Sequence, residues 1–437
     1  MIAEVRAPTA TRAFFGWRVV GGAFVLAVFG WGVGFYGPPV YLHALREARG
    51  WSLALLSAAV TLHFLIGAIA VANLPALYRC FGVPSVTKLG AILLGAGVAG
   101  WGLAREPWQL FAATLLSGAG WVALGAAAVN AIIAPWFVRT RPAALATAYN
   151  GASVGGIVFS PLWVAAIGLL GFPVAAAAIG AVMTSTVWVL ADRLFSRTPW
   201  QMGLAPDGES AGAISPAAVW APARSLPGSL LWRDTKFLTL CIGMALGLFA
   251  QAGLIAHLFS LLVPALGAQR AGFAMGGATA AAIAGRTLVG WVMPAGADRR
   301  LVACASYVVQ IAGSICLLLA AGSRVPLLLI GVILFGAGIG NATSLPPLIA
   351  QVEFVTKDAP RVVALIVAAS QATYAFAPAA FGLIRQVSVS PAATAPGAAP
   401  AFFTSVAIIQ TWAAGAFLVG RSRSGFSGNV LTRGAGR

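Results

Sequence analysis

The feature that most constrains this sequence is a long stretch without a charged side chain, residues 142–191. A helix that crosses the hydrocarbon core of a bilayer needs about 20 apolar residues. The stretch is therefore too long for one crossing and long enough for two. The turn signal Gly171-Phe172-Pro173 lies inside it and predicts where the two helices divide. We expect a pair of membrane-spanning helices here.

The same pattern recurs along all 437 residues, of which 60% are hydrophobic and only 8% charged. The polar chain that remains is too short to form a separate soluble domain. We therefore expect an all-α integral membrane protein with twelve transmembrane helices. The expected spans are residues 19–42, 53–75, 88–104, 108–134, 143–168, 172–190, 237–263, 271–293, 301–321, 325–350, 362–385 and 401–420.

The net charge of +17 is distributed unevenly between the predicted loops. If the amino terminus is cytoplasmic, twenty of the 27 basic residues fall on the cytoplasmic side. This asymmetry is the positive-inside pattern. It predicts a multi-pass protein of the cell inner (plasma) membrane with both termini in the cytoplasm, and it explains the basic composition without a nucleic-acid partner. The basic residues on the outer side are Arg46, Arg49, Arg105, Arg270, Arg324 and Arg385.

Two copies of a six-helix unit are visible in the sequence. Gly118-Ala119-Gly120 recurs as Gly336-Ala337-Gly338, and Pro161 recurs as Pro378, at offsets of 218 and 217 residues. Repeats of this kind are typical of one large class of membrane transporters. We expect an N-terminal half over residues 1–190, a cytoplasmic linker over 191–236, and a C-terminal half with a basic tail over 237–437.

One positive charge, Arg286, lies inside the otherwise uncharged stretch from Ala271 to Ala297. An arginine at the bilayer centre costs about 2.5–3.5 kcal/mol on insertion scales. A structural ion pair would offset that cost, but no acidic residue lies within any long apolar run. A guanidinium matches a carboxylate with a planar fork of donors. Arg286 is therefore the leading candidate to hold a carboxylate substrate in a water-filled cavity.

Further polar side chains lie inside the predicted spans. Tyr36 stands between Gly34 and Gly37, where a phenol can bond a polar ligand. His257 can titrate near neutral pH and is the preferred proton carrier, with His63 as the alternative. A simple position at the membrane interface is the competing explanation for His257. Interhelical hydrogen bonding is the competing explanation for Asn130, Asn341, Gln371 and Tyr374. The other candidates for substrate binding are Gln251, Asn130, Asn341, Gln371 and Tyr374.

Several short motifs lie within or next to the predicted spans. They are Gly16-Trp17-Arg18, Tyr36-Gly37-Pro38-Pro39, Gly50-Trp51-Ser52, Trp136-Phe137-Val138-Arg139-Thr140-Arg141-Pro142 with Gly151, Gly155, Gly156 and Pro161 after it, and Gly285-Arg286 with Gly290 before Asp298-Arg299-Arg300. Together they resemble the monocarboxylate-transporter-like branch of the major facilitator superfamily, which includes bacterial organic-anion carriers. The resemblance covers the whole chain and implies an alternating-access fold with Arg286 as the carboxylate anchor.

Two positions depart from that pattern. Ala282 stands where many animal members carry an aspartate, which leaves the route of proton coupling open. The loop Tyr78-Arg79-Cys80-Phe81-Gly82 lacks the usual acidic and basic pair. We expect conformational latches at the inner helix ends, with purely topological anchoring as the alternative. The expected latch residues are Asp298, Arg299, Arg139 and Arg141.

The sequence thus favours a secondary active transporter of small, monocarboxylate-like organic anions. A multidrug or metabolite exporter of the same fold is the alternative, although a lipophilic cation would find no membrane carboxylate to bind. A membrane enzyme is disfavoured because the spans hold no histidine cluster, no paired acids and no P-loop. We expect no catalytic residue, no cofactor and no metal site.

Overall fold

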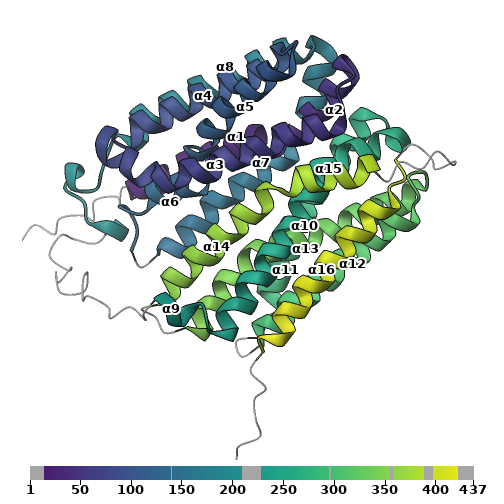
Figure 1. Cartoon of the computed structure of the whole chain (residues 1–437). Coiled ribbons are helices and arrows are strands. Elements are labelled where there is room, and N and C mark those ends of the chain that lie inside the picture. Colours follow the sequence, from purple (N-terminus) through teal and green to yellow (C-terminus); the bar gives the residue numbers. More distant parts are fainter. Residues whose placement is uncertain are drawn as a thin grey trace, which may run out of the picture.

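The computed structural model describes residues 14–138, 140–208, 228–294, 297–354, 358–387 and 397–421, and every regular element in these ranges is helical (Figure 1). The helices before the linker are α1 (Phe15–Gly34), α2 (Gly37–Arg49), α3 (Leu53–Phe81), α4 (Val83–Leu103), α5 (Pro107–Val122), α6 (Ala126–Ile133), α7 (Arg141–Leu170) and α8 (Phe172–Leu190). Those after it are α10 (Thr235–Leu266), α11 (Ala268–Val292), α12 (Arg299–Leu319), α13 (Val325–Glu353), α14 (Ala359–Ala375), α15 (Ala377–Val387) and α16 (Pro400–Val419). Three short helical turns, over residues 191–195, 200–202 and 206–208, and α9 (Gly228–Leu231) belong to the linker.

Eleven helical segments among the described residues are long and apolar enough to cross a membrane. Three of these segments each consist of two helices joined by a short break. The pairs are α1 and α2, α5 and α6, and α14 and α15. The remaining expected span is α11, which is 25 residues long. Its alanine, glycine and polar residues make it less apolar than the others, and it packs against α7, α10 and α13. The all-helical membrane fold is confirmed.

The two Gly-Ala-Gly copies pack in the same way. A Cβ atom built on Gly118 or Gly120 of α5 would meet backbone atoms of α3 and α4 at 2.4 and 2.3 Å. A Cβ atom on Gly336 or Gly338 of α13 would meet backbone atoms of α11 and α12 at 2.4 and 2.7 Å. Only glycine permits such close approach of helices. The repeat in the sequence is therefore a repeat of one three-helix contact.

The break between α1 and α2 follows from proline chemistry. Pro38 has no N–H, so the carbonyl of Gly34, four residues earlier, has no donor within the helix. His63 of α3 lies with Nε2 3.0 Å from that carbonyl oxygen. Its Nδ1 lies 2.9 Å from the hydroxyl of Ser117 on α5. Since a carbonyl only accepts, Nε2 donates, and the buried His63 satisfies the broken helix.

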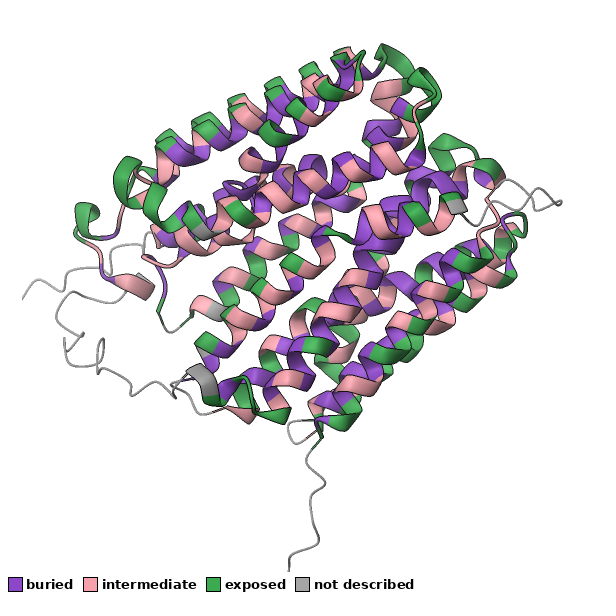
Figure 2. Cartoon of the chain, in the orientation of Figure 1, coloured by how far each residue is buried: buried purple, intermediate pink, exposed green. Residues whose placement is uncertain are grey.

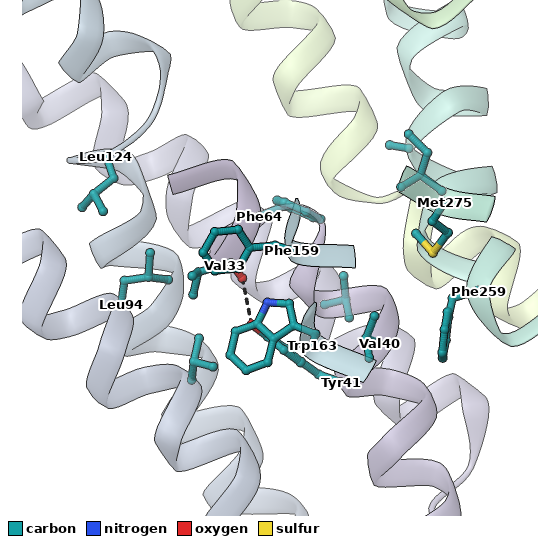
Figure 3. Packing of buried hydrophobic residues seen from close by; sticks show 14 of the residues in the cluster. Val33, Val40, Tyr41, Phe64, Leu94, Leu124, Phe159, Trp163, Phe259 and Met275 are labelled. Carbon is teal, nitrogen blue, oxygen red and sulfur yellow. Dashed lines mark hydrogen bonds between the residues drawn. The ribbon is translucent and has the colours of Figure 1, made fainter. Parts of the chain in front are cut away.

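A tyrosine closes the other side of this break. The Tyr41 hydroxyl donates to Val33 O over 3.1 Å, and its ring packs edge-on against Trp163 with centroids 4.7 Å apart (Figure 3). The same ring stacks on Phe172 at 5.1 Å. These contacts fix the kink, and the kink leaves Tyr36 at the junction of α1 and α2.

The two halves meet at one end of the bundle and diverge toward the other (Figure 1). We call the end where α1 begins and α16 ends the terminal end, and the opposite one the distal end. Near the distal end Ala379 N donates to Thr61 Oγ1 over 3.0 Å, and the rings of His43 and Phe259 lie 5.1 Å apart. Closer to the middle, Gly276 of α11 lies against α7, where a Cβ atom would meet a backbone oxygen at 3.0 Å. The distal end is closed.

The outer face of the bundle is exposed and apolar. Helices α4, α8, α12 and α16 show long exposed stripes (Figure 2). Large hydrophobic side chains occupy those stripes, among them Ile92, Val182, Val308, Ile315 and Trp412. A water-soluble protein does not expose apolar surface on this scale. The stripes are the surface that lipid covers.

Candidate substrate-binding site

Arg286 lies on α11, closely packed against α13. Its Nε donates to Gly340 O over 3.2 Å. The approach depends on small residues, because a Cβ on Gly340 would lie 2.3 Å from Ala282 O and one on Gly285 would lie 2.1 Å from Ala337 O. The small neighbours of Arg286 that face α13 therefore serve helix packing, and they bring the guanidinium beside a carbonyl.

The guanidinium retains unused donors. Arg286 is half-buried, and within the described ranges its only hydrogen bond runs from Nε, with no salt bridge to any carboxylate. Both Nη nitrogens are thus available to a ligand. A buried charge without a partner is costly, and an anion bound at Nη would offset that cost.

Tyr36 and Thr279 lie together across the boundary between the halves. Both touch Gly156 of α7, where a Cβ atom would lie 2.7 Å from Tyr36 Cε2 and 2.7 Å from Thr279 Oγ1. Tyr36 also lies within electrostatic reach of Arg286. A small cavity opens beside this contact, and apart from Tyr36 and Thr279 its walls are apolar. The lining residues are Tyr36, Ile255, Leu258, Met275, Ala278, Thr279, Phe335 and Ile339.

The other expected binding residues are spread over both halves. Gln251 of α10 is buried, and its Oε1 has no hydrogen-bond partner among the described residues. Asn341 is buried on α13, one residue after the carbonyl that Arg286 contacts. Tyr374 of α14 packs edge-on against Phe64 of the other half, with ring centroids 6.0 Å apart. Gln371 lies nearly one turn earlier on α14 and is half-buried.

Asn130 is engaged within its own half. Its Nδ2 donates to Ala126 O over 3.0 Å and also contacts the Tyr149 hydroxyl. Tyr149, on α7, packs edge-on against Trp31 at 6.2 Å. Sequence reasoning missed Tyr149, because no local signal shows that residues 130 and 149 lie together.

His257 lies at the closed distal end and not in the wall of the cavity. It is fully buried, its Nε2 lies 3.0 Å from Pro378 O, and its Nδ1 lies 3.3 Å from Arg385 Nη1. Its neighbour Leu258 does line the cavity. The structure therefore brings Arg286 and Tyr36 near each other and places His257 in a separate cluster.

The expected latch residues occupy the terminal end. Asp298 caps α12 by accepting from Arg300 N at 3.0 Å and Leu301 N at 3.2 Å, and it accepts from Arg421 Nε at 2.7 Å. Arg299 donates to Leu348 O over 2.8 Å. These contacts all join helices of the C-terminal half. In the other half Arg141 is the first residue of α7, and Arg139 lies outside the described residues.

The Asp298 carboxyl is shifted toward its charged form. Burial alone raises its pKa, but the hydrogen bonds from Arg421 and from the backbone N–H groups of Leu301 and Arg300 outweigh burial and hold the pKa below its usual value. Because the folded-state pKa is lowered, this contribution to stability is present at neutral pH. It is lost as the pH falls through the acid range.

The strongest ion pair of the terminal end was not foreseen. Arg300, only 2% exposed, donates to Glu353 through Nε at 2.6 Å and Nη2 at 2.7 Å. It also donates to Lys236 O at 2.8 Å and Thr239 Oγ1 at 3.1 Å. One side chain thus ties α12 to α13 and α10. The sequence places Arg300 in the Asp298-Arg299-Arg300 motif, but nothing local identifies its partner.

Two acidic residues of the linker contact the N-terminal half. Asp207 accepts from the backbone N–H groups of Val138 at 3.0 Å and Thr140 at 3.1 Å. Lys88 of α4 forms an ion pair with Asp192 and lies over the Trp188 ring, 4.6 Å from its centroid. The linker therefore docks on the α6–α7 connection.

Two halves of membrane-crossing helices meet around Arg286, Tyr36 and Thr279. A family model for the Major Facilitator Superfamily matches residues 20–378. The chain belongs to this superfamily, which confirms the broader part of the resemblance found in the sequence. Its family makes it a membrane transporter and not an enzyme.

Solved structures agree with this assignment. The nucleoside transporter NupG superposes with a TM-score of 0.69 at 12% identity, covering 93% of this chain and 98% of that chain. A bacterial homolog of the human lysosomal transporter Spinster, in an inward-facing and occupied conformation, gives 0.67 at 14% identity, covering 94% and 97%. Identities this low show a shared fold and not a shared substrate. No curated protein matches the chain.

Proposed function

We propose that this transporter moves small organic anions of the monocarboxylate type by alternating access. The observation that carries the proposal is Arg286, a half-buried guanidinium with free Nη donors and no carboxylate partner in the described part of the chain. A carboxylate completes that site, because it accepts two parallel hydrogen bonds from a planar fork. The resemblance of Gly285-Arg286 to the monocarboxylate-transporter-like branch supports the same assignment.

The surroundings of Arg286 suit a ligand with one charged end and one apolar end. Tyr36 lies in electrostatic reach of the guanidinium and can donate a hydrogen bond to the ligand. The adjoining cavity is lined mainly by Leu258, Met275 and other apolar side chains. A short monocarboxylate places its head at Arg286 and its tail against this wall.

The direct test is ligand-induced thermal stabilisation of the purified protein. Acetate, lactate, pyruvate, oxalate and succinate are compared with nucleosides and with lipophilic cations, at equal ionic strength. A ligand that binds only the folded state raises the melting temperature, and the stabilisation grows with the logarithm of the ligand concentration divided by Kd. Stabilisation by carboxylates alone supports the proposal. Stabilisation by lipophilic cations alone supports the alternative, a multidrug exporter of the same fold.

We propose that the terminal end faces the cytoplasm, since most basic residues lie there. Cys80 is exposed at the terminal end, and Ser323 is exposed at the distal end. A membrane-impermeant thiol reagent should label Cys80 only after cells are permeabilised. It should label a Ser323→Cys variant in intact cells. The reverse pattern would invert the orientation.

We propose that Asp298, Arg299, Arg139 and Arg141 act as latches that stabilise one conformation of the terminal end. The hydrogen bonds of Asp298 to α12 and to Arg421 support this role. Asp298→Asn keeps an acceptor for the helix cap but weakens the bond to Arg421. We expect faster labelling of cysteines introduced beside the cavity. Unchanged labelling on both faces would leave these residues as topological anchors.

Proton coupling through His257 is the last part of the proposal. A protonated His257 cannot accept from Arg385, so proton binding would loosen the closed distal end. The charged groups that face it are Arg385 of α15 and Arg46 of α2, with the His43–Glu47 pair beside them. Outside acidification should drive uptake into vesicles, and His257→Gln should flatten that response while His63→Gln does not. Uptake indifferent to an imposed pH gradient would exclude proton coupling.

A further inference from the structure

A second cation without a carboxylate partner lies at the closed distal end. Arg385 is in the last turn of α15 and is half-buried. Its Nη1 donates to Ser260 Oγ over 2.7 Å and lies 3.3 Å from His257 Nδ1. Within the part of the chain that the structure describes, Arg385 forms no salt bridge. Its hydrogen-bond partners are therefore uncharged hydroxyl and imidazole groups.

The protonation state of His257 follows from its contacts. Nε2 lies 3.0 Å from the carbonyl oxygen of Pro378, which only accepts, so Nε2 carries the proton. Nδ1 then presents its lone pair to Arg385. The imidazole is neutral and adds no negative charge. Arg385 is thus positioned by its neighbours without being neutralised by them.

The other half adds positive charge to the same place. Arg46 of α2 lies within electrostatic reach of both Arg385 and His257. The nearby Glu47 lies with Oε1 3.2 Å from His43 Nε2, and its side chain is 68% exposed, so solvent screens its negative charge. Like charges from the two halves therefore face each other where the halves meet. An anion between them would relieve the repulsion.

The cluster lies next to the central cavity. His257 and Ser260 belong to the same part of α10 as Ile255 and Leu258, two residues that line the cavity. His43 packs on Phe259 of this segment from the other half. Arg46 is exposed and Arg385 is half-buried, and both lie at the distal end. Arg286 follows Thr279, a residue that lines the cavity, by about two turns of α11. The cavity therefore lies between the two distal arginines and Arg286.

We propose that Arg385 is a second anion-binding residue, which takes the substrate carboxylate at the distal entrance before Arg286 holds it. This inference rests on the proposed function and adds a stage to it. When the distal end opens, the guanidinium exchanges its neutral acceptors for the incoming carboxylate. Arg46 on the opposite half attracts the same group. When the distal end closes, Arg385 again donates hydrogen bonds to Ser260 and His257.

The test uses Arg385→Gln in proteoliposomes loaded so that uptake starts at the distal face. Glutamine keeps N–H donors for Ser260 and His257 but removes the charge. With the panel carboxylate that most stabilises the wild type, we expect the KM for uptake from the distal face to rise about tenfold. Thermal stabilisation by that carboxylate, which reports the Arg286 site, should change less than about twofold. Arg324→Gln removes an exposed charge at the same end and is the matched control.

Two results would overturn the inference. An unchanged KM would show that the charge of Arg385 is not used by the substrate. If Arg385→Gln leaves the KM unchanged but increases the labelling of cavity cysteines from the distal face, Arg385 only holds the distal end closed. If the wild type itself neither binds nor transports any carboxylate of the panel, the proposed function fails first. That outcome is distinct from carboxylate transport that ignores Arg385.

Discussion

Replacing Arg286 by alanine is expected to lower carboxylate uptake about 30-fold or more while the protein still reaches the membrane. Truncating one partner of a desolvated, hydrogen-bonded charge pair typically costs about 2–5 kcal/mol. Arg286→Lys should lose most uptake as well, because an ammonium supplies a point charge without the planar fork. Uptake of a labelled carboxylate into vesicles, normalised to the amount of protein, measures both effects.

The matched control lies on the same helix. Arg270 is exposed near the start of α11 and does not line the cavity, so Arg270→Ala removes the same charge from the surface. It should leave uptake within about twofold of the wild type, since exposed charges contribute little. Near-normal uptake by Arg286→Ala would end the carboxylate proposal. Equal losses in both variants would point to net charge and not to the site.

The membrane fold could be predicted because its signal is local. A run of about 20 apolar residues predicts each span. The Gly-Ala-Gly repeat predicts that α5 and α13 make equivalent close helix contacts in the two halves. The sequence also predicts the span at 271–293, although α11 is rich in small and polar residues and is less apolar than the other spans. That composition has a physical cause, because α11 packs between α7 and α13 and carries Arg286.

The candidate site was predictable only where one residue was anomalous by itself. Arg286 could be found from its uncompensated charge. The sequence offers His63 as an alternative proton carrier, yet His63 donates to the Gly34 carbonyl that Pro38 leaves free. The expected span over residues 19–42 is unbroken, and the break between α1 and α2 becomes visible only in the structure. No sequence rule names the side chain that satisfies the free carbonyl. Asn130 and Tyr149 likewise meet only through the packing of α6 on α7.

Long-range ion pairs are the hardest feature to foresee. Arg300 and Glu353 are 53 positions apart, and each looks like an ordinary charge at the end of a helix. Their bidentate contact forms only because α12 and α13 lie side by side along their length. The same packing buries Arg300 to 2% exposure. Because Arg300 is buried and bidentate, we expect the stability of the C-terminal half to depend on this pair.

Removing one partner of this pair is therefore expected to destabilise the protein strongly. Glu353→Gln leaves the buried Arg300 charge without its carboxylate, and Arg300→Met leaves Glu353 without its guanidinium. Removing one partner of a buried ion pair typically costs about 3–5 kcal/mol. The double variant Arg300→Met with Glu353→Leu should recover much of the loss, because well-packed apolar residues can replace a buried pair. Melting temperatures of the wild type, Arg300→Met, Glu353→Leu and the double variant in one detergent form a double-mutant cycle that measures the coupling.

The neighbouring pair Arg421–Asp298 is the control, because its side chains are 38% and 37% exposed. Arg421→Ala should cost less than about 1 kcal/mol, as exposed ion pairs do. Additive effects of the Arg300 and Glu353 variants would mean that the two side chains do not stabilise each other. If Arg421→Ala lowers the melting temperature as much as Glu353→Gln does, exposed charges stabilise this end as much as the buried pair does. The argument from burial would then be wrong.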